Sequence, residues 1–355
     1  MKRERVNSIE IWRVFFVCMV LIWHTKYLPW STAENQILRS AHGVDFFLLL
    51  SGYLMAKHAE RPQEAGLGKD SLQFILHKIG SFYPMYLLAV IFDLLSRWLV
   101  AGYTVEPEKL RFYVWDLLLL REAGLHGETL TTTAIGSSWY LMAMVLAMAL
   151  LYPMLRANKD VFLRILAPLI TVFLYGWFSQ VKGMLYFTLK FEHGVSLGLL
   201  RAVAGICLGC VCYQLAANLR RTGWNRNRLI RAAATLAELA AVYSVVHCSI
   251  RYKAGPLDFV CVLLEALLLI SEFGGFSLLS DLAEKVKLGW VGSFTLALYI
   301  SHFTWIYILI RRKPDWSREE GLAVFFAAAI LTAIGFVWLQ KGIRRMLKRT
   351  GIVKT

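Results

Sequence analysis

The sequence has few charged residues and no long polar segment. Only 18% of its 355 residues are Asp, Glu, Lys or Arg, whereas 57% are hydrophobic, and the mean hydropathy is +0.53. No stretch between the apolar segments is long enough to bury a core of its own. These absences exclude an ordinary soluble protein, so we expect an all-α, polytopic membrane helix bundle that forms one integral-membrane domain over residues 1–355.

Acidic residues are scarce relative to basic ones. The chain has 24 Asp and Glu against 39 Lys and Arg, which gives a formal net charge of +15. In a soluble protein this excess would indicate nucleic acid as a partner. Here the basic residues cluster in loops between apolar segments, where they set the orientation in the membrane and meet anionic lipid. We therefore expect membrane lipid as a partner and no nucleic acid.

The six cysteines all fall in or next to apolar segments. Cys207, Cys210 and Cys212 form the cluster CLGCVC, but a zinc site would need a fourth ligand and a polar second shell. We expect a packed membrane helix there and no metal. A cleavage site is missing as well, because no small-residue motif follows Trp23, and this predicts an uncleaved first span.

Ten apolar segments are candidates for membrane spans, which need about 20 mostly apolar residues each. The short second segment could extend to Ala41–Lys57 if it is tilted. The ten segments are Ile9–Leu28, Val44–Ala56, Phe82–Val100, Trp139–Leu155, Val161–Gln180, Ser196–Ala216, Leu229–Ser249, Leu257–Leu279, Trp290–Ile310 and Gly321–Gln340.

Loop charge orients these spans. Residues 2–5 and 220–231 are rich in Lys and Arg, so both stretches should be cytoplasmic. Six spans separate them, an even number as required, and the short segment Phe112–Leu120 is therefore expected to be a half-helix or an interfacial segment in an outer loop. Both termini, including a basic tail at 341–355, then lie in the cytoplasm. One loop opposes this orientation, because four basic residues fall on the outer side: Arg311, Arg312, Lys313 and Arg318.

Arg13 and His24 lie eleven positions apart in the first span. Eleven residues are close to three helical turns, so both side chains share one face, about 16 Å apart along the axis. An ionisable group in a membrane span costs roughly 2.5–3.5 kcal/mol, and two on one stripe indicate an internal polar site. The spacing equally allows the alternative that each side chain snorkels to its own membrane interface.

Asp45 and His302 are expected at the depth of His24. Asp45 is near the outer end of the second span, and His302 lies past the midplane of the ninth span, in LYISHFTW. An Asp bonded to a His commonly fixes its tautomer, so we expect Asp45 to orient His24. The alternatives are that Asp45 is an interfacial residue and that His302 is a helix-packing histidine.

Three glycines indicate places where a helix can be approached closely. Gly52, directly after Ser51, allows another backbone or a thin ligand to come close. Gly205 and Gly209 form a small-xxx-small pair, for which we favour helix packing.

Four motifs together resemble the acyltransferase 3 family of membrane acyltransferases, and their order and spacing run along the whole chain. They are the Arg-x10-His of Arg13 and His24, GVDFFLLLSGYLM at Gly43–Met55, SSWYL at Ser137–Leu141 and LYISHF at Leu298–Phe303.

The chain departs from the family pattern in two places. Where the family often has Arg-x-x-Arg followed by a proline, this chain has FILHKIGSFYP, with Lys78 in the first basic place and Ser81 in the second. The acidic residue that some members carry after the aromatic W-[FY]-L motif is also missing, with Ala143 and Met144 in that region. The resemblance therefore does not identify the molecule that accepts the acyl group.

The resemblance implies that the enzyme takes an acyl group, usually acetyl, from a cytoplasmic coenzyme A thioester. The group would go to a hydroxyl of a cell-envelope carbohydrate or its lipid-linked precursor. Acetyl-coenzyme A or another acyl-coenzyme A would be a co-substrate, with no permanently bound cofactor, and the protein would lie in the plasma (inner) membrane.

Roles for the candidate residues follow from the same resemblance. His24 would act as general base or transient acyl acceptor, oriented by Asp45. Arg13 and Lys78 would bind the donor. Candidates for acceptor contacts or oxyanion stabilisation are Ser51, His302, Trp139 and Tyr140. For Trp139 and Tyr140 the interfacial aromatic belt is an alternative.

A transporter or flippase of an envelope precursor is a rival interpretation. It would share the bundle and its midplane polar residues, but it also predicts inverted repeats with broken helices. No repeat is evident in the sequence. A membrane sensor or scaffold without catalysis is a third hypothesis.

Overall fold

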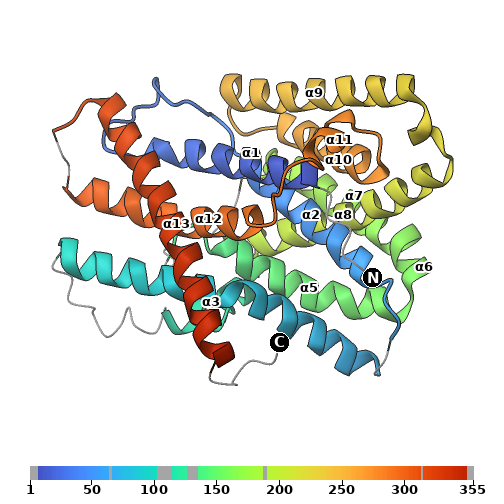
Figure 1. The fold of residues 1–355 in the computed structure, drawn as a ribbon, viewed down its shortest axis with the longest axis horizontal. Coiled ribbons are helices and arrows are strands. Elements are labelled where there is room, and N and C mark those ends of the chain that lie inside the picture. The colour runs from blue at the N-terminus through green and yellow to red at the C-terminus, as the bar shows by residue number, and fades with distance from the viewer. Residues whose placement is uncertain are drawn as a thin grey trace.

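The computed structural model describes residues 7–63, 66–101, 113–125, 135–186, 190–312 and 315–349. Within these ranges the chain is helical, apart from loops and one short hairpin in which Phe191–Glu192 (β1) pairs antiparallel with Val195–Ser196 (β2). Most of the long helices run along the longest axis of the molecule, whereas the C-terminal helix crosses its neighbours obliquely (Figure 1). The expected all-α polytopic bundle is confirmed.

A helix covers each of the ten expected spans. The fifth span combines α6, α7 and two π-helical turns, Phe162–Leu166 and Phe178–Lys182, in one continuous helix. The helices are α1 (Asn7–His24, continued by a 3₁₀ turn Thr25–Tyr27), α2 (Gly43–His58), α3 (Leu67–Ala101), α5 (Trp139–Ala157), α6 (Lys159–Val161), α7 (Ala167–Trp177), α8 (Leu197–Arg221), α9 (Arg228–Arg251), α10 (Leu257–Gly274), α11 (Leu278–Ala283), α12 (Val291–Arg312) and α13 (Arg318–Arg349).

At eight of the ten spans the described helix is long and apolar enough to cross a membrane. The two others are α2, which has 16 residues, and α10, which carries three buried acids. Helix α10 ends at Gly274, earlier than the expected Leu279, because Gly275 adopts a left-handed conformation (φ 78°) that terminates the helix.

Three further boundaries differ from the sequence-based expectation or refine it. Helix α3 begins at Leu67, fifteen residues before the expected span, and so includes Lys78. Of the short segment Phe112–Leu120, residue 112 lies outside the described residues and 113–117 form a single helical turn. The basic tail starts as part of α13, which continues to Arg349, and residues 350–355 lie outside the described ranges.

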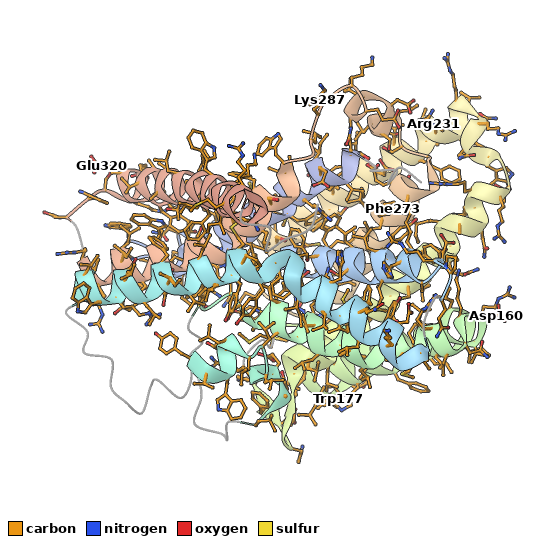
Figure 2. All side chains as sticks on the ribbon, turned by 60° about the horizontal axis from the view of Figure 1, so that its bottom comes forward. Asp160, Trp177, Arg231, Phe273, Lys287 and Glu320 are labelled. Carbon is orange, nitrogen blue, oxygen red and sulfur yellow. The ribbon has the colours of Figure 1, made fainter. Side chains whose placement is uncertain are left out.

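The termini of the helices lie at two opposite ends of the bundle. The C-termini of α1 and α12 and the N-terminus of α13 lie at one end, where Arg318 Nη2 donates to the Asn35 carbonyl oxygen (2.8 Å) in the loop after α1. We call this the His24 end and the opposite one the Arg13 end. Figure 2 shows Glu320 at the first and Asp160 and Arg231 towards the second.

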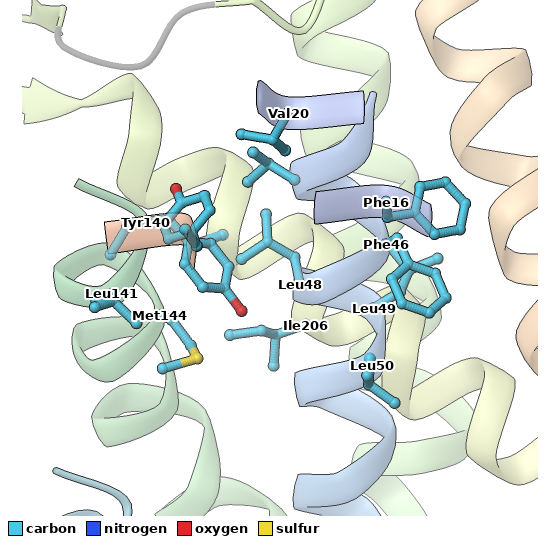
Figure 3. Packing of buried hydrophobic residues seen from close by; sticks show 14 of the residues in the cluster. Phe16, Val20, Phe46, Leu48, Leu49, Leu50, Tyr140, Leu141, Met144 and Ile206 are labelled. Atoms are coloured by element: carbon cyan, nitrogen blue, oxygen red, sulfur yellow. The ribbon is translucent and has the colours of Figure 1, made fainter. Parts of the chain in front are cut away.

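Helices α2 and α8 touch through their backbones. A Cβ added to Gly52 would overlap the carbonyl oxygen of Ile206, and one added to Gly209 would overlap that of Leu49. Figure 3 shows Ile206 of α8 beside Leu48 of α2. The neighbour that Gly52 admits is therefore a backbone rather than a thin ligand, and the packing role favoured for Gly209 is confirmed.

Replacing Gly52 with Ala should prevent α2 and α8 from reaching this separation. We expect a large loss of monodisperse protein in detergent, measured by fluorescence-detected size-exclusion chromatography, and a lower Tm.

Gly335→Ala is the matched control, because Gly335 lies within α13 and an added Cβ there meets nothing within 4 Å. This change should be neutral or stabilise the protein by up to about 1 kcal/mol through helix propensity. Equal behaviour of the two variants would contradict the close packing.

Candidate functional site

His24 and His302 form a hydrogen-bonded pair at the His24 end. His302 Nε2 lies 3.0 Å from His24 Nδ1, and His302 Nδ1 lies 3.2 Å from the carbonyl oxygen of Leu298. His302 is fully buried and His24 is half-buried. The two expected site residues on α1 and α12 are thus brought into direct contact.

The hydrogen bonds assign the tautomers of the pair. The Leu298 carbonyl can only accept, so His302 Nδ1 carries a proton and donates it. In neutral His302 the other nitrogen, Nε2, is then an acceptor, and His24 Nδ1–H donates to it. These hydrogen bonds leave the lone pair of His24 on Nε2. A general base or a nucleophile requires this arrangement.

Asp45 does not orient His24, contrary to the expectation from the sequence. Both oxygens of its buried carboxylate bind the buried guanidinium of Arg201, at 2.9 Å from Nε and 2.6 Å from Nη2. Among the described residues no hydrogen bond joins Asp45 to His24. A bidentate arginine is a stronger partner for a carboxylate than a neutral imidazole, so Asp45 joins α2 to α8 and His302 takes the orienting position.

Removing one partner of this buried pair should destabilise the protein rather than only inactivate it. Asp45→Ala leaves a buried, unpaired guanidinium, for which we expect a loss of about 3–5 kcal/mol of stability. The measurement is the Tm of the purified protein, compared with the double variant Asp45→Leu, Arg201→Leu. The double variant should regain part of the loss because it removes both charges, and a single variant with unchanged Tm would contradict the structural role.

A cavity of about 310 Å³ opens on the Arg13 side of the molecule. It brings together four of the expected site residues: Arg13, Ser51, Lys78 and Tyr140. Ser81, which stands where the family often has the second arginine of Arg-x-x-Arg, lines the cavity as well. The volume is within the range of small-molecule sites.

The polar groups of this cavity favour an anion at one part of it. Arg13 and Lys78 are its charged lining residues, and no carboxylate is among its described lining residues, although Glu10 lies 3.3 Å from the Arg13 guanidinium. The walls elsewhere are largely apolar, with Phe47, Leu50, Leu54, Phe82, Leu141, Met144 and Leu296. The cavity therefore combines two cations with a lining that suits an apolar or amide chain.

The start of α12 forms part of the same wall, which the sequence reasoning missed. Gly289, Gly292 and Ser293 line the cavity where α12 begins. A Cβ at Gly292 would lie 2.8 Å from Arg13 Nη1, so the absent side chain makes room for the guanidinium. Helix N-termini favour anions through their free N–H groups and dipole, and this one lies beside Arg13.

The cavity ends before it reaches the histidine pair. Its far wall includes Tyr140 and Tyr299, whose rings lie edge to face with centroids 5.6 Å apart. The Tyr299 ring is 6.1 Å from that of His302. Arg13 and His24 thus share the α12-facing side of α1, but two tyrosine rings separate the cavity from His24.

Hydrogen bonds hold both tyrosine rings of this wall. Tyr140 OH donates to the Phe47 carbonyl (3.2 Å) and lies 3.3 Å from Ser51 Oγ, and Tyr299 OH donates to the Ser137 carbonyl (2.8 Å). Figure 3 shows Tyr140 on α5 facing α2, above Met144. Trp139 is buried, lies 5.8 Å from the Arg201 guanidinium and is not among the lining residues, so neither aromatic belongs to an exposed belt.

A known family matches nearly the whole chain. A family model described as an acyltransferase domain matches residues 6–341. The chain belongs to the acyltransferase 3 family. Neither a curated protein nor a solved structure matches it. The protein is therefore a membrane acyltransferase.

Two residues of this acyltransferase site escaped the sequence reasoning for different reasons. Arg201 gave a signal, because an arginine in the second turn of an apolar helix needs a buried partner. Tyr299 lies in the motif LYISHF, but only its neighbours in the structure distinguish it from a tyrosine that packs within a span.

Proposed function

We propose that this acyltransferase moves an acyl group, usually acetyl, from a cytoplasmic acyl-coenzyme A to a hydroxyl of a cell-envelope carbohydrate or its lipid-linked precursor. The observation that carries the proposal is the His24–His302 pair, which leaves one imidazole nitrogen with a free lone pair behind the tyrosine wall of a cavity with two cations. No permanently bound cofactor is needed, because acyl-coenzyme A is a co-substrate.

The cavity is the donor site of this proposal. Coenzyme A has phosphates at one end and its thioester at the other, so Arg13, Lys78 and the start of α12 would bind phosphate groups. The apolar walls would cover the pantetheine arm. Ser51 would donate to one of its carbonyl groups, and Tyr140, whose proton goes to the Phe47 carbonyl, would accept from one of its amide N–H groups. Ser51 and Tyr140 are therefore assigned to the donor rather than to the acceptor.

His24 performs the chemistry in this scheme. Its Nε2 accepts the proton of the acceptor hydroxyl, whose oxygen forms the new bond to the thioester carbonyl carbon. The carbon–sulfur bond then breaks, and the thiolate of coenzyme A takes the proton back from His24. In the alternative, Nε2 itself first accepts the acyl group and then gives it to the hydroxyl. His302 accepts from Nδ1–H in both versions and stabilises the charge on the ring.

The thioester has to pass the wall formed by Tyr140 and Tyr299 to reach His24. We assign this passage to a movement of the two rings when the donor binds, in which their hydrogen bonds to backbone carbonyls and to Ser51 and their contacts with neighbouring rings are exchanged for contacts with the donor.

The Arg13 end faces the cytoplasm in this proposal, with both termini inside and the protein in the plasma membrane. The connection from α8 to α9, which carries several arginines, lies at that end together with the start of α1. The positive-inside bias supports this orientation.

Release of free thiol from acetyl-coenzyme A tests the proposal. Purified protein with an envelope glycan extract should release coenzyme A, whereas a transporter should not. His24→Ala should lower the rate by about 10²–10⁴-fold, the usual contribution of a positioned base, and leave the Tm unchanged.

His247→Ala is the control, because His247 is an exposed histidine of α9. It should retain the full rate. Normal transfer by the His24 variant, or no thiol release by the unaltered protein with any glycan fraction, would overturn the proposal. A burst of thiol without acceptor would favour the acyl-histidine route.

Gly292→Ala tests the donor site without changing any charge. The added Cβ would push the Arg13 guanidinium away, so we expect a KM for acyl-coenzyme A raised by about tenfold or more, the factor that 1.4 kcal/mol gives, with a smaller change in kcat. Arg13→Lys should act in the same direction, because an ammonium lacks the bidentate fork. Gly335→Ala again serves as the control, and an unchanged donor KM in both test variants would contradict the assignment.

A further inference from the structure

Lys26 is held among aromatic rings two residues after His24. Its Nζ lies 3.4 Å from the ring centroid of Trp23 and 4.9 Å from the centroids of Tyr27 and Tyr186. The Tyr186 hydroxyl, 3.5 Å away, accepts from it. The ammonium therefore has a fixed position at the His24 end, set by cation–π contacts.

This charge is not neutralised within the described part of the chain. No Asp or Glu there forms an ion pair with Lys26, and its described partners are aromatic. Ring faces attract a cation but leave its net charge in place, and a half-buried ammonium gains most from an anionic partner.

An exposed ring lies next to the same group. Tyr27 is 42% exposed, and its ring stacks towards that of His24, with centroids 6.1 Å apart and an interplanar angle of 22°. Its hydroxyl lies 3.3 Å from that of Tyr186. A flat, partly exposed ring beside the proposed base offers a surface on which the apolar face of a sugar can pack.

The basic loop that opposes the positive-inside bias lies at this end too. Arg311 and Arg312 close α12, and Arg318 opens α13, at the end of the bundle that holds Lys26, while Lys313 lies outside the described residues. Positive charge on the outer side works against insertion, so a function that attracts anions there accounts for its presence.

We propose that the acceptor is an anionic carbohydrate, bound with its ring on Tyr27 and its acidic group on Lys26. The acidic group is the carboxylate of a uronic acid or a phosphate, as in a lipid-linked precursor. In this position a hydroxyl of the same sugar faces His24 Nε2. The inference rests on the proposed function for its chemistry, and as a binding site it stands on Lys26 and Tyr27 alone.

A lipid headgroup is the competing partner for a basic residue near a membrane interface. The observations favour the glycan, because three rings hold Lys26 beside His24, whereas a snorkelling lysine extends freely to the headgroups.

Direct binding tests the inference independently of catalysis. The probes are an oligosaccharide of uronic acids, its neutral methyl ester and a sugar phosphate, titrated by calorimetry into the purified protein in a neutral detergent. We expect at least one anionic probe to bind about tenfold or more tighter than the methyl ester. The anion that binds tighter identifies the source of the charge, and equal affinities for all three would overturn the inference.

Variants of Lys26 locate the preference. Lys26→Gln should bring the ratio of anionic to neutral affinity close to one, and Lys26→Arg should retain most of it. Lys253→Gln is the matched control, because Lys253 is exposed and lies just after α9 at the same end. A ratio that survives Lys26→Gln would overturn the site. Tyr27→Ala should weaken all three probes together.

Thiol release with the same acceptors separates the two proposals. The anionic acceptor should have the lower KM, and Lys26→Gln should raise that KM while the donor KM stays unchanged. If the protein binds the anionic probe through Lys26 but releases no thiol, the proposed function fails and the site stands. If Lys26→Gln lowers activity only in vesicles with anionic lipid, and equally for all acceptors, the lipid is the partner and the inference fails.

Discussion

The parallel register of α1 and α12 is the constraint on which the site depends. Both helices run from the Arg13 end to the His24 end, and they meet at two levels. Gly292 makes room for the Arg13 guanidinium at the first, and His302 bonds to His24 at the second. The offset in residue number is almost the same at both levels, so a slip of one residue along α12 would disrupt both contacts. The donor-side cation and the proposed base are therefore positioned by one helix pair.

A second helix pair, α2 and α8, packs beside the first and positions the tyrosine wall. Helices α2 and α8 meet through Gly52 and Gly209 and are joined by the buried Asp45–Arg201 pair. This rigid unit carries Ser51 and Phe47, which hold Tyr140, and Tyr140 with Tyr299 separates the cavity from the histidines. Under the proposed function, this closed wall would keep water away from the thioester until the acceptor is present, which is an advantage for a transferase.

The cavity around Arg13 and the surroundings of Lys26 differ in their number of positive charges and in the side chains next to these charges. The donor side offers Arg13, Lys78 and a helix N-terminus inside a cavity, which suits phosphate groups. The other side offers a single ammonium among rings, beside the partly exposed Tyr27. An anion at either side would be drawn by positive charge, and the second side adds the partly exposed ring of Tyr27, on which a sugar can pack. Under the two proposals, the first side takes the nucleotide thioester and the second the carbohydrate.

Local sequence determined much of this protein. Hydropathy located a helix at each of ten places, the 3.6-residue period put Arg13 and His24 on one face, and motif spacing indicated Lys78 as a companion of Arg13. Only the tertiary structure decided that His24 pairs with His302 rather than Asp45, and that Tyr140 faces the donor cavity. The physical reason is that an apolar segment fixes how deep a side chain lies in the membrane. Which neighbour it meets at that depth depends on how the helices are rotated and arranged, and packing contacts such as Gly52 against Ile206 set that arrangement.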